Sequence, residues 1–173
     1  VVYQDLALCE NLNVAFNLFL GNEPVHGGWF KILPHFIRPM NSLIMEQKTI
    51  EAIEKLKVQT LGSVFTKVSN LSGGQRQAIA IARATRVNST VVLLDEPTAA
   101  LGVAQTREVL DVIKQLRNTG HAIVYISHNL RDVFEVCDRI TVLRHGQNVA
   151  IFEATKSSPE EIVSAMTLGE NDA

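Results

Sequence analysis

The sequence has 173 residues, enough for one domain with a hydrophobic core and few for two domains of ordinary size. Hydrophobic residues make up 46% and charged residues 20% of the chain, which is typical of folded globular proteins and excludes a disordered chain. The formal net charge of −2 gives no basis for nonspecific attraction to nucleic acid or to an anionic membrane, so we expect no nucleic-acid partner.

Cysteine content and the first residues bear on the compartment of the protein. The chain has two cysteines, Cys9 and Cys137, and no CxxC or Cys/His cluster that would indicate a zinc site. No apolar run reaches the length of a transmembrane helix, and residues 1–5 have no signal-peptide pattern. These features favour a reducing, cytosolic compartment.

The first predicted elements are the end of a strand and two helices. The first two residues are apolar and β-branched, which suits the end of a strand that leads into Gln4. Glycines and prolines then interrupt a helical pattern, which predicts helices at roughly 10–20 and 40–57 with an irregular loop between them. Trp29 and Phe30 in that loop are expected to pack one helix on another. Because the chain opens on Val and not on Met, we expect its true start to lie upstream.

After Gly74 the pattern changes to strands that alternate with helices. The apolar runs at 91–94 and 122–126 are typical of strands buried on both faces. Gly120 is a typical stop signal for the helix before it, and Pro159 suits the first turn of a last helix. The predicted elements are, in order, a helix at 75–86, a strand at 91–94, a helix at 103–118, a strand at 122–126, a helix at 130–136, a strand at 139–143, a turn at 145–147, a hairpin partner at 148–152 and a helix from Pro159. This order predicts an α/β fold with a parallel sheet.

The segment from Leu71 to Gln77 places a hydroxyl and two glycines, Ser72, Gly73 and Gly74, directly before a helix. Glycine permits close approach of the backbone, and a helix N-terminus offers free N–H groups and the positive end of its dipole, so phosphate can be held there. A plain serine cap followed by a glycine turn is the alternative interpretation of the same string. The segments that follow favour the phosphate site.

The segment from Val91 to Pro97 is an apolar run that ends in two carboxylates. An unpaired charge is costly in a core, whereas the carboxyl end of a strand is where α/β proteins bind ligands. Asp95 is suited to hold Mg²⁺ through water, because Mg²⁺ prefers oxygen ligands and keeps part of its hydration shell. Glu96 is suited to orient or deprotonate an attacking water. A surface turn capped by Asp95 is the alternative, which the apolar run before it disfavours.

Two single residues complete the candidate site. His128 follows the predicted strand 122–126 on the same edge as Asp95, where an imidazole can contact a γ-phosphate or its attacking water. A lone histidine is more often structural. Gln4, at another predicted strand end, has an amide oxygen that suits Mg²⁺, although taken singly it carries little information.

Taken together, these segments resemble the Q-loop, signature, Walker B and H-loop of ABC transporter ATPase subunits in order and in spacing. The matching residues are Gln4, Leu71 to Gln75, Asp95 to Pro97 and His128. Residues 71–84, 95–103 and 138–146 are similar to the ATP-binding subunits of bacterial importers for simple sugars of the ribose and xylose class. The resemblance implies a partial P-loop-type cassette, in which a parallel sheet is flanked by helices and joined by a helical subdomain. Residues 1–173 would then form an incomplete ABC ATPase domain, with the helical subdomain at about 5–71 and the remainder of the α/β core at about 72–173.

The resemblance also implies roles for the single residues, because two such cassettes face each other head to tail and enclose ATP. The residues that would touch the γ-phosphate of the partner's ATP are Ser72, Gly73, Gly74 and Gln75. Those that would serve the chain's own nucleotide are Asp95 and Gln4 at Mg²⁺, and Glu96 and His128 in catalysis.

The partners implied by the resemblance are a second cassette and transmembrane permease subunits, with a periplasmic or extracellular sugar-binding protein acting indirectly. Helical residues 8–19 would lie near the membrane subunit and transmit closure to it. The implied location is peripheral, at the cytoplasmic face of the bacterial cell membrane. The implied activity is ATP hydrolysis that powers import of a carbohydrate.

Two features depart from the family pattern. Gly102 stands where the D-loop commonly ends in Asp, which puts the water-positioning contact of that loop in question. The phosphate-binding motif G-x-x-x-x-G-K-[ST], or Walker A, does not occur, since none of the ten glycines is followed by Lys. We therefore expect the first third of the cassette to lie upstream. This chain alone is expected to bind ATP with millimolar affinity at most and to show no measurable turnover.

Two other classes share these motifs. Soluble cassette ATPases of DNA repair carry a long coiled coil or zinc-binding cysteines between Q-loop and signature, whereas an ordinary helical insert separates Gln4 from Ser72 here. Ribosome-associated members carry two cassettes with a charged linker, which a single domain does not reveal. A non-catalytic module that pairs with a full-length subunit is the third alternative, and only the missing motif argues for it.

Overall fold

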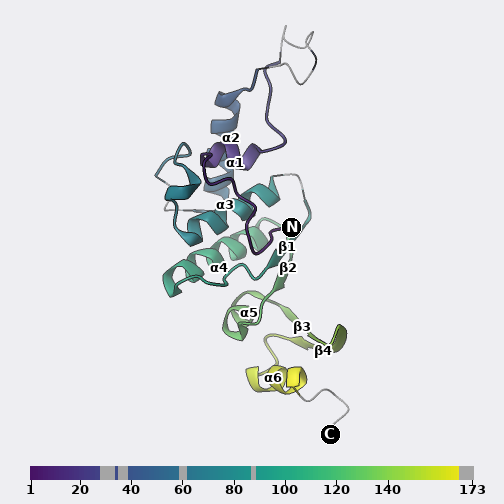
Figure 1. Cartoon of the computed structure of the whole chain (residues 1–173). Coiled ribbons are helices and arrows are strands. Elements are labelled where there is room, and N and C mark those ends of the chain that lie inside the picture. The colour runs from purple at the N-terminus through teal and green to yellow at the C-terminus, as the bar shows by residue number, and fades with distance from the viewer. Residues whose placement is uncertain (28–33, 35–38, 59–61, 87–88, 168–173) are drawn as a thin grey trace. The chain divides into compact units, whose positions relative to one another are not determined.

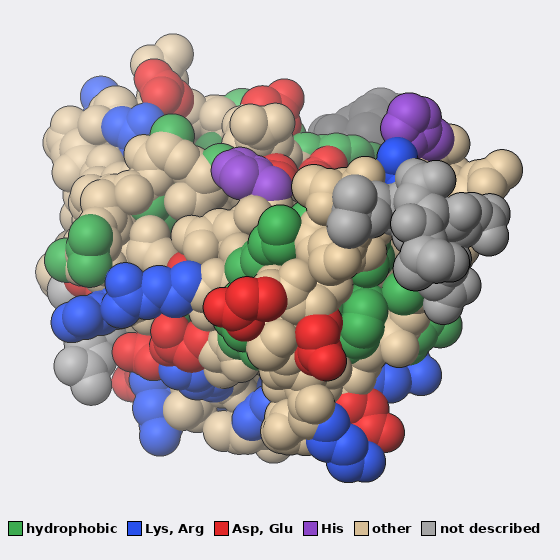
Figure 2. Space-filling model, turned by 90° about the horizontal axis from the view of Figure 1, so that it is seen from below, with side chains coloured by type: hydrophobic (Ala, Val, Ile, Leu, Met, Phe, Trp, Pro, Cys, Tyr) green, Lys and Arg blue, Asp and Glu red, His purple; other side chains and the backbone are tan. Residues whose placement is uncertain are grey.

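The computed structural model describes residues 1–27, 34, 39–58, 62–86 and 89–167. The chain divides into two compact units, Val1–Ile126 and Ser127–Ala173, and each is described by itself. The packing role predicted for Trp29 and Phe30 lies outside the described residues. On the face drawn in Figure 2, basic and acidic side chains are interspersed, in keeping with the small net charge.

The first unit contains the predicted helices up to residue 118 and the two parallel strands (Figure 1). Its elements are α1 (Val14–Phe19), α2 (Ser42–Lys55), the 3-10 turn η3 (Val68–Asn70), α3 (Gly73–Thr85), β1 (Val91–Asp95), α4 (Val103–Asn118) and β2 (Ala122–Ile126). The bounds of α4 and β2 are those predicted from the sequence, because periodicity and Gly120, whose φ is +89°, define them locally. The first helix is shorter than predicted and begins at the cap residue Asn13, whose side chain accepts a hydrogen bond from the Phe16 N–H.

The strands of the first unit align three segments in parallel. β1 pairs with β2 from Val91 opposite Ala122 to Asp95 opposite Ile126. On its other side β1 forms a parallel bridge with Val2, whose N–H donates to the Leu93 carbonyl at 2.8 Å. This bridge confirms the prediction that the first two residues are the end of a strand that leads into Gln4.

The prediction that both strands are buried on both faces is wrong. In β1, Val92 and Leu94 are fully buried while Val91 is 56% exposed. In β2, Val124 and Ile126 remain 47% and 44% exposed. Successive side chains of a strand point to opposite faces, and the core of this unit covers one face, so a continuous apolar run overstated the burial.

Helix α3 is the centre of the helical packing in the first unit. It contacts α1, α2 and α4, and the consecutive residues from Gln77 to Ala82 are all buried. A helix buried on nearly every side needs apolar residues beyond one stripe, which the alternation of Ala and Ile in this segment supplies. The predicted helical subdomain at about 5–71 lies within this unit, and its separate standing stays a prediction.

The second unit is an antiparallel hairpin with two helices (Figure 1). Its elements are α5 (Leu130–Val136), β3 (Arg139–Arg144), β4 (Gln147–Glu153) and α6 (Pro159–Thr167). His145 and Gly146 both have positive φ, as a two-residue hairpin turn requires, which confirms the predicted turn. Helix α6 contacts both strands and buries Ile162. No helix in the described part of the chain is long and apolar enough to span a bilayer.

Candidate functional site

The signature segment forms a reciprocal cap at the start of α3. The Ser72 hydroxyl oxygen accepts a hydrogen bond from the Gln75 N–H at 3.2 Å. In return, the Gln75 side-chain oxygen accepts from the Ser72 N–H at 2.9 Å. This capping box fixes the first turn of the helix, so the alternative interpretation of Ser72 as a serine cap is also correct.

The two glycines of the signature allow α3 to approach α4 closely. A Cβ atom on Gly73 would lie 2.7 Å from the Leu101 side chain. One on Gly74 would lie 3.1 Å from the Glu108 carboxylate and 3.3 Å from the Gln105 Cα atom. Close packing is therefore a reason for glycine at both positions, whether or not phosphate binds there.

Asp95 and Glu96 lie where β1 ends, as predicted. The Asp95 N–H donates to the Val2 carbonyl at 3.1 Å, and the Glu96 N–H donates to the Ile126 carbonyl at 2.9 Å. Glu96 has a φ of +47°, a left-handed conformation that is uncommon for residues other than glycine. Such conformations concentrate at functional sites, where surrounding contacts hold them.

The turn after Glu96 is closed by contacts of its own. The Glu96 carbonyl accepts from the Ala99 N–H at 3.1 Å, and Ala100 is again left-handed with a φ of +60°. The Thr98 hydroxyl lies 3.2 Å from the Tyr125 hydroxyl on β2. These contacts define the direction in which the chain leaves the strand.

Gln4 lies in an exposed turn that directly follows the bridge between Val2 and β1. Because Val2 and β1 run in parallel, Gln4 follows its strand at the same edge at which Asp95 ends β1. An amide and a carboxylate oxygen at one edge form a donor set that suits Mg²⁺. No group of three or more His, Cys, Asp or Glu side chains among the described residues is placed to hold a metal ion.

His128 belongs to the second unit and is exposed. Beside it, the Ser127 hydroxyl accepts a hydrogen bond from the Asn129 N–H at 3.1 Å. The structure thus brings Gln4, Asp95 and Glu96 to one sheet edge, whereas His128 belongs to the other unit. The signature lies in the same unit as that edge, at the start of α3.

Sequence reasoning missed the arginines of α3. The Arg83 guanidinium donates to the carbonyls of Leu6 and Ala7 at 3.0 and 2.8 Å. Arg76, about two turns earlier on the same helix, forms an ion pair with Glu10 at 3.2 Å. An arginine on a helix is ordinarily a surface residue, and only the tertiary structure reveals the groups that these two contact.

A cavity of about 430 Å³ is lined by residues from the first segment of the chain, from α1 and from α3, among them Leu6, Leu18 and Arg83. Arg86 also lines it and lies over the Phe19 ring, with 4.3 Å between guanidinium and ring centroid. Burial lowers the pKa of Arg86, and the negative charge of Glu23 partly offsets this effect. Hydrogen bonds from the backbone at Gly21 and at Glu23 itself lower the pKa of the Glu23 carboxyl.

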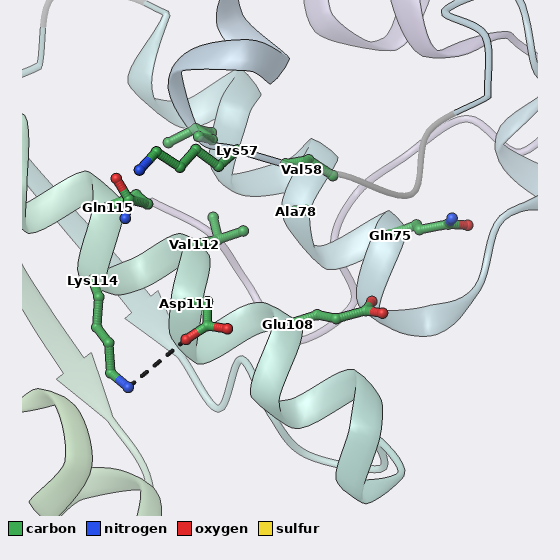
Figure 3. Close-up of a pocket in the computed structure, with 11 residues that line it drawn as sticks. Lys57, Val58, Gln75, Ala78, Glu108, Asp111, Val112, Lys114 and Gln115 are labelled. Carbon is green, nitrogen blue, oxygen red and sulfur yellow. Dashed lines mark ion pairs between the residues drawn. The ribbon is translucent and has the colours of Figure 1, made fainter.

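A second cavity, of about 340 Å³, lies beside the first turn of α3 (Figure 3). Residues that directly follow α2, including Lys57 and Val58, form one part of its wall, and α4 forms another. Glu108 and Asp111 line it from α4, and Asp111 pairs with Lys114 at 3.8 Å. Gly74 and Gln75 border this cavity, which is distinct from the edge that carries Asp95 and Glu96.

The parallel strands, the acidic strand end and the capped helix are parts of an α/β fold of the ATP-binding-cassette class. Solved structures show the same fold. A nucleotide-free ATP-binding cassette from an ABC transporter, 24% identical, superimposes with a TM-score of 0.68 over 95% of this chain and 61% of that chain. A dimeric cassette in a post-hydrolysis state bound to ADP and phosphate, 23% identical, gives a TM-score of 0.64 over 88% of this chain and 61% of that chain.

Sequence comparison gives the family. Residues 1–99 match the family described as ABC transporter, and the chain belongs to it. The fructose import ATP-binding protein FrcA of Rhizobium meliloti is 41% identical, over 96% of this chain and 63% of its own length. The xylose import ATP-binding protein XylG of Moorella thermoacetica is 39% identical over 96% of this chain and 31% of its length. The ribose import ATP-binding protein RbsA 2 of Escherichia coli O157:H7 is 37% identical over 96% and 30%.

These relatives confirm the resemblance to ATP-binding proteins of sugar import. The chain spans less than two thirds of the length of each of them. The strand-end carboxylates and the capped signature lie in the part of the chain that these matches cover.

Proposed function

We propose that this chain is part of an ATP-hydrolysing subunit that powers import of a simple sugar through a membrane permease. The observation that carries the proposal is the end of β1, where Asp95 and Glu96 follow a partly buried strand and Glu96 is held in a left-handed conformation. The relatives named for fructose, xylose and ribose import support the choice of a sugar as the transported substrate.

The proposed roles follow from the donor chemistry at the sheet edge. Asp95 and Gln4 offer oxygen atoms to Mg²⁺, which when bound would neutralise charge on the β- and γ-phosphates of ATP. Glu96 orients the attacking water and accepts its proton, and His128 donates a hydrogen bond to the γ-phosphate. The start of α3, with Ser72 to Gln75, offers N–H groups and a dipole to the nucleotide of a second cassette.

The proposed assembly is a head-to-tail pair of cassettes at the cytoplasmic face of the membrane, bound to permease subunits. Residues 8–19, which include α1, would meet the permease. A sugar-binding protein outside the membrane would deliver the substrate to the permease. Comparison with the solved dimeric cassette supports the pairing at the level of fold.

The test uses the complete reading frame that contains this sequence, expressed with its permease and placed in lipid vesicles. Glu96→Gln keeps the size and hydrogen bonding of the side chain and removes its charge. We expect ATP hydrolysis to fall at least about a hundredfold while ATP binding persists. Glu160→Gln, on exposed α6, is the matched control and leaves hydrolysis unchanged.

Three outcomes would overturn the proposal. Hydrolysis that survives Glu96→Gln would remove Glu96 from the chemistry. Absence of hydrolysis in the unaltered complete subunit, with ATP still bound or not, would favour the non-catalytic module. Sugar uptake into the vesicles that ignores ATP would separate the chain from transport altogether.

A further inference from the structure

The turn after Gln4 is an unfavourable backbone conformation. Leu6 and Ala7 are consecutive left-handed residues, with φ of +57° and +46°. Neither is glycine, and residues of this kind keep a left-handed conformation only where their surroundings over-determine it. Local hydrogen bonds exist, from the Leu6 N–H to the Tyr3 carbonyl at 3.0 Å and from the Ala7 N–H to the Asp5 carbonyl at 2.7 Å. These bonds close the turn, but they do not involve the carbonyl groups of Leu6 and Ala7.

Arg83 supplies the partners for those carbonyl groups. Its two terminal nitrogen atoms donate to successive carbonyls, Nη2 to Leu6 at 3.0 Å and Nη1 to Ala7 at 2.8 Å. Two neighbouring carbonyl groups suit the planar fork of a guanidinium, which a lysine ammonium does not reproduce. The contact spans from the second half of α3 to the N-terminal segment, so it is set by the tertiary fold.

Gln4 is therefore anchored on both sides. Two residues before Gln4, Val2 forms a bridge with Leu94 of β1. Leu94 is followed by Asp95, a candidate Mg²⁺ ligand. Two residues after Gln4, Leu6 is held by Arg83 of the helix that begins at the signature. The position of Gln4 is thus determined jointly by the strand end and by α3.

A second arginine of α3 reinforces the link. Arg76 pairs with Glu10 at 3.2 Å and also donates to the Ser69 carbonyl at 3.1 Å. The Arg76–Glu10 ion pair is solvent-exposed, and exposed pairs contribute little stability. Arg83 thus binds the backbone of Leu6 and Ala7, and Arg76 binds the side chain of Glu10, so two residues of one helix contact this segment.

We propose that Arg83 is a positioning residue that fixes Gln4 at the strand edge by holding the left-handed turn, and thereby links the signature helix to the chain's own nucleotide site. The proposal rests on the proposed function of Gln4 as an Mg²⁺ ligand. Under this proposal, Arg83 affects the Mg²⁺ concentration that hydrolysis requires, although it is not among the residues that contact the nucleotide.

The test compares Arg83→Lys with Gln4→Ala and with the double variant in the complete subunit. Arg83→Lys keeps the charge and loses the bidentate contact, and we expect amide hydrogen exchange in residues 5–10 to rise about tenfold. The Mg²⁺ concentration for half-maximal hydrolysis should rise several-fold in Arg83→Lys and in Gln4→Ala. It should not rise further in the double variant, because Arg83 acts through Gln4. Arg107→Lys, on the exposed face of α4, is the matched control and changes neither quantity.

Additive effects in the double variant, or an unchanged exchange rate in residues 5–10 of Arg83→Lys, would overturn the proposal. If Gln4→Ala leaves the Mg²⁺ requirement unchanged, the proposed role of Gln4 fails, and the exchange rates still decide whether Arg83 holds the turn. If Arg83→Lys does not fold, exchange in the unaltered subunit decides. Residues 5–10 must then open together with the second half of α3, and independent opening contradicts the link.

Discussion

The signature segment and the turn after Gln4 hold their backbone in opposite ways. In the signature, Ser72 and Gln75 exchange two hydrogen bonds between side chain and backbone, and the backbone of Ser72 has ordinary extended angles. In the Gln4 turn, left-handed residues depend on Arg83, which is far away in the sequence. The first structure is encoded locally and the second by tertiary contacts. Changes in remote helices should therefore disturb the Gln4 turn and spare the signature cap.

Asn17 offers the strongest way to test this contrast, because it lies on α1 and holds the segment after Gln4. Its side chain is fully buried, accepts from the Cys9 N–H at 2.7 Å and donates to the Cys9 carbonyl at 2.9 Å. Asn17→Leu keeps the size of the side chain and leaves these backbone groups without a partner. We expect a loss of about 3 kcal/mol in the free energy of unfolding, measured by denaturant titration of the complete subunit.

The same substitution at the exposed Asn118, the last residue of α4, is the control and should change stability by less than about 0.5 kcal/mol. Hydrogen exchange should rise in residues 5–10 of Asn17→Leu and stay unchanged at the first turn of α3. A loss no larger than that of the control would mean that other contacts hold this segment, and the contrast would fail.

Gly74 tests a tertiary requirement of the signature, its close approach to α4. A Cβ atom there would meet the Gln105 Cβ at 3.2 Å and Cα at 3.3 Å, so backbone would have to move. Gly74→Val should lower stability by about 2 kcal/mol through overpacking, measured by thermal unfolding. Gly102→Ser is the control, since Gly102 has open space and a φ of −71°, and serine there can cap α4. Equal melting temperatures for the two variants would show that α3 tolerates displacement from α4.

The features of this fold that the sequence predicts are those encoded locally, and the features it does not predict depend on tertiary contacts. Helix 103–118 and the hairpin turn at His145 and Gly146 follow from periodicity and turn chemistry, which act over a few residues. The carboxylates at the end of β1 were located by the apolar run before them. The one-sided burial of β1 and the exposure of β2 were not predicted, because a run of apolar residues does not reveal how many faces of a strand are covered.

The contacts of Arg83 and the conformation of Glu96 lay beyond sequence reasoning for a related reason. An arginine on a helix reads as a surface residue until the backbone it meets is known. Leu6, Ala7 and Glu96 are residue types that rarely adopt positive φ, so nothing in their identity marks the turn. Functional turns of this kind depend on the whole fold, and they are where local rules fail.

Substitution of Ser72 has the smallest expected effect on stability. It tests whether the signature cap and the Gln4 turn are held independently of each other. Ser72→Ala removes the hydroxyl that accepts from the Gln75 N–H and should cost about 1 kcal/mol of stability, whereas Ser72→Thr keeps most of it. Because the cap is local, the rise in hydrogen exchange should be confined to the first turn of α3. The turn at Leu6 and Ala7, held from Arg83 further along the helix, should exchange as before. If exchange rises in residues 5–10 as well, the signature cap and the Gln4 turn form one cooperative unit, and the division between local and tertiary encoding does not apply to this helix.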